Sequence, residues 1–99
     1  MSIQHTVVFR LVHPEGSVEE QAFLDAAPGI LASIPGVQNF AVARQVSAKS
    51  TLTHQFSMTF ADQDGYDGYN NHPEHVAFVA NRWGAEVAEF QEYDFVGIA

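Results

Sequence analysis

The sequence predicts one α+β domain, in which a small sheet is covered by helices. Residues 3–12 and 52–60 alternate apolar and polar side chains, as strands with one buried face do. The segments that begin at Ser17 and Asp62 space their apolar residues as helices do. The chain has 99 residues, of which 46% are hydrophobic, so it is long enough for one domain with one core.

Composition argues against several classes of function. Twelve acidic residues against four basic ones give a net charge of -8, which repels nucleic acid and anionic membranes. The absence of cysteine excludes disulfides, thiolate nucleophiles and cysteine zinc sites. The N-terminus lacks a signal-peptide pattern, and the longest apolar run, residues 76–80, is too short to span a bilayer. We therefore expect a cytoplasmic domain that acts on small molecules or proteins.

The first strand and the first helix follow from the side-chain pattern. One face of the strand carries the apolar residues and a histidine: Ile3, His5, Val7, Phe9 and Leu11. A turn at residues 13–16 leads to Ser17, which forms a capping-box signature with Glu20. Helical spacing of apolar residues continues to Ile34, and we expect Pro28 to kink or break this helix.

A hairpin of two strands should follow the helix. Pro35 and Gly36 end the helix, and residues 37–46 are expected to form the second strand. The polar residues 47–51 then form a hairpin loop before the strand over residues 52–60. The apolar face of that strand carries Leu52, His54, Phe56, Met58 and Phe60.

The second helix is expected in two pieces. Asp62 suits the N-cap of a short helix that carries Tyr69 and a packing residue, Tyr66. Pro73 suits the first position of the next helix, so His72 should lie at or near its N-cap. The buried stripe of this helix is expected to comprise Val76, Val79, Ala80, Trp83 and Val87, and residues 90–96 are expected to form a final strand.

This β-α-β-β-α-β order is the ferredoxin-like arrangement, with a four-stranded sheet of the antiparallel type and a split second helix. We expect the strands over residues 3–12 and 52–60 to be central, adjacent and parallel. Both helices should cover one face of the sheet. Each of these strands carries a histidine near its start, so His5 and His54 should be neighbours beneath the helices.

Several short motifs resemble the stress-responsive dimeric α/β barrel (Dabb) family. The most specific is the Tyr-x-x-His-Pro-x-His string from Tyr69 to His75. The other matching pieces are His5 to Phe9, Ile34 to Val37, His54 before Phe60, and Tyr93 to Phe95. The resemblance covers essentially the whole chain and implies a ferredoxin-like protomer that forms a homodimer, sheet to sheet.

The resemblance also implies an activity. One branch of the family comprises polyketide cyclases, such as those like olivetolic acid cyclase, which use a Tyr-His pair for aldol condensation without a cofactor. Those roles carry over to Tyr69 and His75, with His5 and His54 in the pocket. Some relatives hold a cation through backbone carbonyls after the first helix, here near residues 33–37. The Pro28-Gly29 pair is not a family feature, so the identity of the substrate does not transfer.

The position of His75 suits a base. With Pro73 at the first helical position, His75 lies near the third, where the helix dipole disfavours imidazolium. A neutral imidazole can accept a proton near pH 7. The Tyr69 hydroxyl could bond the imidazole or a carbonyl oxygen that gains charge. The predicted pocket, between the sheet and the helices, is lined by His5, Phe9, Phe23, Ala27, His54, Phe56, Tyr69, His75 and Phe78.

Other interpretations remain open at this point. The strand histidines could be hydrogen-bonded core residues, and His72 could be a cap or an accessory site residue. His72, His75 and a strand histidine could instead supply three nitrogens to zinc. The function could be that of a cofactor-free lyase or cyclase, a cofactor-free monooxygenase, or a stress-associated binding or assembly protein without turnover.

Overall fold

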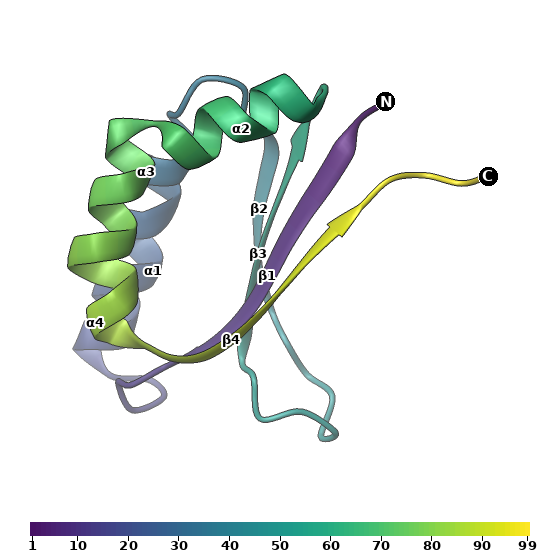
Figure 1. The fold of residues 1–99 in the computed structure, drawn as a ribbon. Coiled ribbons are helices and arrows are strands. Elements are labelled where there is room, and N and C mark those ends of the chain that lie inside the picture. The colour runs from purple at the N-terminus through teal and green to yellow at the C-terminus, as the bar shows by residue number, and fades with distance from the viewer.

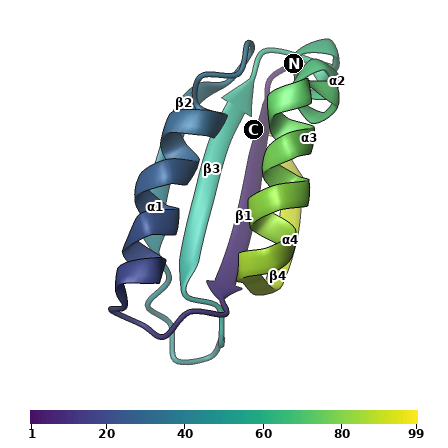
Figure 2. The same cartoon turned by 90° about the vertical axis from the view of Figure 1, so that its left-hand side faces the viewer.

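The computed structural model describes residues 1–99 and contains one four-stranded sheet of order β2-β3-β1-β4. Every neighbouring pair of strands is antiparallel. The helices lie together on one face of the sheet (Figures 1 and 2). The elements in chain order are β1 (Ile3–Leu11), α1 (Val18–Leu31), β2 (Gln38–Arg44), β3 (His54–Phe60), α2 (Gln63–Asn71), α3 (Pro73–Phe78), the π-helical turn η1 (Val79–Trp83), α4 (Gly84–Glu86) and β4 (Val87–Phe95).

The predicted α+β, ferredoxin-like fold is confirmed, but the relative direction of two strands was wrong. β1 and β3 are central and adjacent, yet they run antiparallel rather than parallel. The reason is connectivity: the helical crossover makes β1 and β2 parallel, and the turn back from β2 to β3 reverses the chain between them.

The antiparallel register separates the two strand histidines. His5 pairs with Met58, whereas His54 pairs with Phe9, four residues further along β1. At about 3.4 Å per residue, the two positions are therefore roughly 14 Å apart along the strands. The expectation that His5 and His54 would be neighbours beneath the helices is wrong.

The hydrophobic core fills the space between the sheet and the helices. Its largest fully buried side chains are Phe9, Phe23, Phe56, Phe60 and Met58. Strand alternation supplies four of these five from β1 and β3, and α1 supplies Phe23. None of the helices has the length and apolar character needed to span a membrane.

Helix α1 begins as its sequence predicts but is not broken at Pro28. The Ser17 hydroxyl accepts from the Glu20 amide at 3.2 Å, and the Glu20 carboxylate accepts from the Gly16 amide at 3.1 Å. The helix nevertheless continues through Pro28 to Leu31 (Figure 2). Proline sits here in the last turn, where it removes a single backbone bond near the end of the helix.

The second helical region starts at its predicted caps but buries a different stripe. Val76 and Val79 are 54% and 40% exposed, and Val87 is the first residue of β4 rather than a helical residue. Phe78 is buried in their place. The error lies in the choice of helix face, because Phe78 follows Val76 by two residues, on the opposite side of the helix, and it is Phe78 that faces the core. The π-helical turn at residues 79–83 comes after Val76 and shifts only the positions that follow it.

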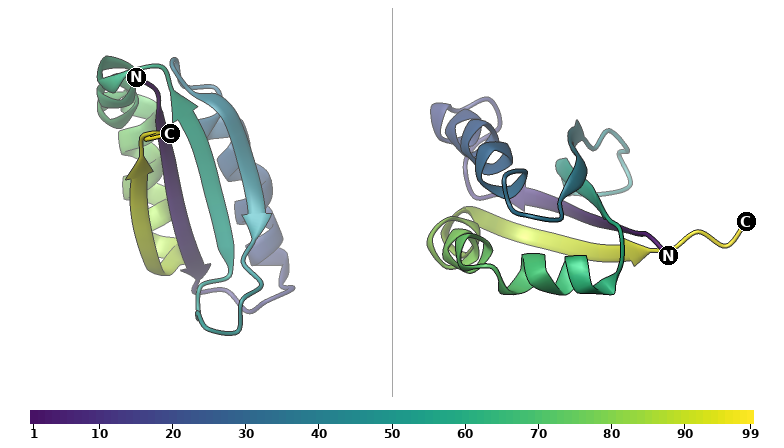
Figure 3. Two further views of the ribbon diagram at one scale, coloured as in Figure 1. Left: turned by 90° about the vertical axis from the view of Figure 1, so that its right-hand side faces the viewer. Right: turned by 90° about the horizontal axis from the view of Figure 1, so that it is seen from above.

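The sheet face opposite the helices is uncovered in the protomer (Figure 3, left). Thr6 of β1 lies opposite Tyr93 of β4, and Gln4 lies opposite Phe95, so these four side chains share that face. The Tyr93 and Phe95 rings are 48% and 51% exposed and stack with their centroids 6.1 Å apart. This face therefore presents a partly aromatic surface.

Candidate functional site

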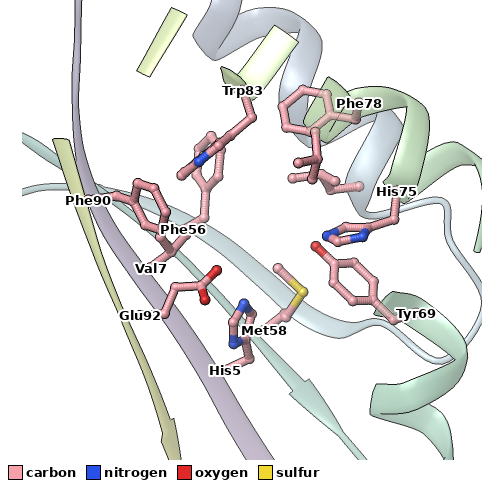
Figure 4. A pocket seen from close by; sticks show the side chains of 12 residues that line it. His5, Val7, Phe56, Met58, Tyr69, His75, Phe78, Trp83, Phe90 and Glu92 are labelled. Carbon is pink, nitrogen blue, oxygen red and sulfur yellow. The ribbon is translucent and has the colours of Figure 1, made fainter. Parts of the chain in front are cut away.

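A cavity of about 230 Å³ lies between the sheet and the layer formed by α2, α3 and η1. Figure 4 shows its wall, which is mostly apolar with a few titratable groups that point inward. Such a combination is typical of small-molecule sites. The lining residues are His5, Val7, Leu31, Phe56, Met58, Tyr69, His75, Phe78, Val79, Trp83, Phe90 and Glu92.

His75 is held at the cavity by the turn that joins α2 to α3. The side chain of His72 caps α3 by accepting from the Glu74 amide at 3.1 Å, which fixes the start of the helix. Nδ1 of His75 lies 3.2 Å from the carbonyl oxygen of Asn70. A carbonyl only accepts, so Nδ1 carries the proton and Nε2 has the free lone pair. Burial lowers the pKa of His75, which keeps the ring neutral near pH 7.

Tyr69 lies directly beside this imidazole. The two ring centroids are 4.4 Å apart, and the hydroxyl of Tyr69 points toward His75 (Figure 4). Tyr69 is 2% exposed and packs on Phe60 at the end of β3, with ring centroids 5.1 Å apart. Burial raises the pKa of Tyr69 well above its ordinary value, so the hydroxyl stays protonated as a hydrogen-bond donor.

His5 is held on the opposite side of the cavity by a network of three side chains. Its Nδ1 lies 2.7 Å from Asp94 Oδ1 and 3.0 Å from the Tyr66 hydroxyl, which itself donates to Asp94 Oδ2 at 3.0 Å. Because a carboxylate only accepts, Nδ1 of His5 must carry the proton, and Nε2 is left with a lone pair. Burial and the bond to Asp94 raise the pKa of Tyr66 well above its usual range.

The structure brings together part of the predicted site. Five predicted residues line the cavity: His5, Phe56, Tyr69, His75 and Phe78. The other predicted pocket residues do not: Phe9, Phe23, Ala27 and His54. Phe9, Phe23 and Ala27 are fully buried. Phe9 and Phe23 pack behind the cavity wall, against its lining residue Phe56. They were predicted to line the pocket because periodicity gives the face on which a residue lies but not its position along that face.

His54 is a core residue rather than a residue of the cavity. It is 3% exposed and stacks on Phe9, with ring centroids 5.8 Å apart. Its Nδ1 contacts the Thr53 hydroxyl at 2.9 Å, and its Nε2 has no hydrogen-bond partner. The remaining accessory candidate, His72, is a helix cap outside the cavity lining.

Sequence reasoning missed three groups at the site. Tyr66 was assigned to packing alone, and neither Asp94 nor Glu92 was selected. Both carboxylates reach the cavity side because β4 pairs with β1, which places Asp94 opposite His5 and Glu92 opposite Val7. Alternation along residues 90–94 was the available signal, since Phe90, Glu92 and Asp94 share one face.

The three-histidine zinc arrangement is not formed. No group of three or more His, Cys, Asp or Glu side chains is placed so that it could hold a metal ion. His72 points its Nδ1 at the backbone of α3, and the strand histidines lie at different ends of the sheet.

Comparison with known proteins decides the family. Residues 3–96 match the stress responsive A/B barrel domain, Dabb. The chain belongs to this family. A Dabb protein of ferredoxin-like fold from Mesorhizobium loti is 50% identical, with a TM-score of 0.97 over 99% of this chain and 98% of that one. A stress-response A/B barrel domain-containing protein of Arabidopsis thaliana is 55% identical over 29 residues, which cover 29% of this chain and 26% of the plant protein.

More distant solved structures share the fold of this Dabb chain. A dimeric ferredoxin-like protein of unknown function from Thermobifida fusca is 23% identical, with a TM-score of 0.75 over 96% of this chain and 90% of that one. A hydroxynitrile lyase from Passiflora edulis is 15% identical, with a TM-score of 0.77 over 95% of this chain and 91% of that one. At these identities the likeness concerns the fold alone.

Proposed function

We propose that the cavity binds a small apolar or aromatic carbonyl compound and that His75 and Tyr69 act on it as an acid–base pair. The reaction would be that of a cofactor-free lyase or cyclase of the aldol type. One observation carries the proposal: a neutral imidazole and a protonated phenol lie 4.4 Å apart, centroid to centroid, in the wall of a mostly apolar cavity. The lyase named among the structures of the same fold is consistent with this class of chemistry.

The proposed roles follow from the protonation states of the two groups. Nε2 of His75 removes a proton from the carbon next to a substrate carbonyl, and the electron pair of that C–H bond moves to the carbonyl oxygen. The Tyr69 O–H donates a hydrogen bond to this oxygen as it gains negative charge. The resulting enolate carbon attacks a second carbonyl, and the new alkoxide takes back the proton from the His75 imidazolium. The reverse sequence cleaves the same bond.

His5 serves the proposed reaction as a second proton-transfer group. Asp94 and Tyr66 fix the proton on Nδ1 of His5, so Nε2 can accept a hydrogen bond or a proton from the substrate. His5 comes from β1 and His75 from α3, so the two imidazoles lie on the sheet side and the helix side of the cavity (Figure 4). An acid–base pair on opposite sides of the substrate can remove a proton at one carbon and deliver one at another.

We also propose that the protomer forms a homodimer through the uncovered face of the sheet. The exposed Tyr93 and Phe95 rings on that face support the proposal. A dimeric protein of the same fold supports it further. A specific interface should bury more than about 1,200 Å² in total.

The test combines ligand screening with product analysis. Aromatic and polyketide-like carbonyl compounds would be screened by thermal shift, and each hit would be incubated with the protein and examined for products by mass spectrometry. For a converted hit, His75→Ala should lower kcat by about 10²- to 10⁴-fold, the usual contribution of a positioned acid–base group. Tyr69→Phe keeps the ring and should lower kcat with little change in binding. The matched control is His72→Asn, which removes a neighbouring imidazole but keeps a residue that caps helices well.

The outcomes separate the competing functions. Equal turnover by the wild type and His75→Ala would remove His75 from the mechanism. Turnover that requires oxygen would point to a monooxygenase. A hit that stabilises the wild type and both site variants equally, with no product from any of them, would favour a binding protein without turnover.

A further inference from the structure

Glu92 is the one ionisable cavity residue whose side chain has no assigned partner or role. Its carboxylate points into the cavity in Figure 4, and it stands opposite Val7 of β1 in the strand pairing. Its neighbour on the same face, Asp94, is engaged by His5 and Tyr66. Glu92 forms no hydrogen bond or ion pair within the protomer, so its carboxylate is available to a ligand.

The arginines of the protomer are occupied by other carboxylates. Arg10 pairs with Glu89 at 3.6 Å and Arg44 with Glu15 at 3.1 Å, while Arg82 pairs with Glu86. The remaining basic side chain, Lys49, lies in the loop between β2 and β3. No lysine or arginine lines the cavity, so no fixed positive charge offsets the Glu92 carboxylate there.

Two aromatic rings line the same cavity as this carboxylate. Phe90 precedes Glu92 on the inward face of β4, and the Trp83 indole packs edge-on against Phe90 with centroids 5.6 Å apart. Both rings line the cavity. The faces of aromatic rings attract cations, and a carboxylate beside them adds a full negative charge.

We infer that Glu92 makes the cavity selective for apolar molecules that carry a protonated amine, with the Glu92 carboxylate as the counter-ion of the ammonium group. This inference rests on the proposed function, because it names the class of molecule that the same cavity takes. The ammonium lies at Glu92, while the apolar body fills the space between Phe56, Phe78 and Trp83. Carboxylates are excluded, because they would meet Glu92 without a compensating cation.

The experiment uses three probes that share one ring and differ in the end group: 2-phenylethylamine, 2-phenylethanol and phenylacetate. Dissociation constants would be measured by NMR titration at pH 7 and low salt, for the wild type and for Glu92→Gln. The matched control is Glu89→Gln. Glu89 lies on the same strand, faces the other side of the sheet opposite Arg10, and its substitution changes the net charge of the protein by the same amount.

The wild type should bind the amine at least about fivefold more tightly than the alcohol and the carboxylate, as expected for one partly exposed ion pair of about 1 kcal/mol. This preference should disappear in Glu92→Gln and persist in Glu89→Gln. Equal affinities in the wild type, tighter binding of phenylacetate, or binding of none of the probes would overturn the inference. Equal loss of the preference in both variants would do the same, because it would reflect net charge rather than a local contact.

Failure of this inference can be distinguished from failure of the acid–base proposal. An amine preference that depends on Glu92, together with turnover that His75→Ala leaves unchanged, would support the proposed ligand class and contradict the acid–base mechanism. Conversion of a carbonyl compound that requires His75, with no amine preference in the wild type, would support the acid–base mechanism and contradict the proposed ligand class. Melting curves of the variants would show that the exposed Glu92 can be replaced without loss of the fold.

Discussion

Replacement of His54 by phenylalanine should make the protein less sensitive to acid. His54 is 3% exposed and its Nε2 has no hydrogen-bond partner. The Thr53 hydroxyl donates its proton to the Phe9 carbonyl at 3.2 Å. The same hydroxyl must therefore accept from Nδ1 of His54, so the neutral ring carries its proton on Nδ1. Burial lowers the pKa of His54 below its ordinary value of 6.5. The folded state therefore binds a proton at His54 less tightly than the unfolded chain does, so acid favours unfolding.

The sign and the limit of this effect follow from linkage. The contribution of the neutral His54 ring to the free energy of unfolding is fully present above pH 6.5. This contribution is lost as the pH falls from 6.5 toward the lower pKa of the folded state. In this window one histidine can cost at most about 1.4 kcal/mol per pH unit. A phenylalanine at this position keeps an aromatic ring on Phe9 and has no proton to bind. The free energy of unfolding of the variant should therefore fall less between pH 7 and pH 5.

At pH 7 two changes oppose each other in this variant. The bond from Nδ1 to Thr53 is lost, at a cost of about 1 kcal/mol, and an unpaired buried nitrogen is removed, a gain of roughly 1–3 kcal/mol. The variant should thus be as stable as the wild type at pH 7 or up to about 2 kcal/mol more stable.

The assay is urea unfolding at pH 7 and pH 5 at fixed ionic strength and protein concentration. His75, whose pKa is also lowered by burial, contributes equally to both proteins, so the difference between their pH dependences isolates His54. The same loss of stability on acidification in both proteins would refute the reasoning. A variant that is less stable than the wild type by more than about 2 kcal/mol at pH 7 would also refute it. Such a loss would show that Nε2 of His54 makes a stabilising hydrogen bond in the wild type.

Two further predictions concern the site and the first helix. In Asp94→Asn the proton of the neutral His5 ring should no longer be fixed on Nδ1, since the amide of asparagine can donate to Nδ1 as well as accept from it. The ¹⁵N chemical shifts of His5 should move toward the Nε2-protonated tautomer, and unchanged shifts would contradict the role given to Asp94. Ser17→Ala removes the side-chain cap that accepts from the Glu20 amide and should lower the free energy of unfolding by about 1 kcal/mol. Urea unfolding measures this, and no change would show that water replaces the cap.

Local patterns predicted the elements of this fold well, because each depends on residues close in sequence. Alternation predicted β1 and β3, the Ser17 and Asp62 caps marked the starts of two helices, and Pro73 marked the start of a third. The direction of β3 relative to β1 was predicted wrongly although connectivity determines it. The exposed Val76 was predicted as buried because residues 76–80 are all apolar, so spacing alone did not show that Phe78 rather than Val76 faces the core.

The candidate site was predictable only in part, because it depends on strand register. The Tyr69 to His75 string is local, and the structure places both of these side chains at the cavity. Asp94 and Glu92 reach the site through pairing with β1, a contact between residues almost ninety positions apart in the chain. No periodicity within β4 shows which residue of β1 stands opposite. His54 was misplaced for the same reason, since its strand face was correct and its position along the sheet was not.

The register also explains why a polar site is tolerated in such a small protein. At one end of the sheet, Leu11, Phe9 and Phe56 pack with Phe23 in a core that carries one unpaired polar atom, on His54. At the other end, His5, Asp94 and Tyr66 satisfy one another, and Tyr69 and His75 face the cavity. Substitution of the unpaired Glu92 or of His75 should therefore change binding or proton transfer with little effect on stability, since neither holds the apolar end together. Removal of Phe56, which belongs to both ends, should cost roughly 3–5 kcal/mol and enlarge the cavity at the same time.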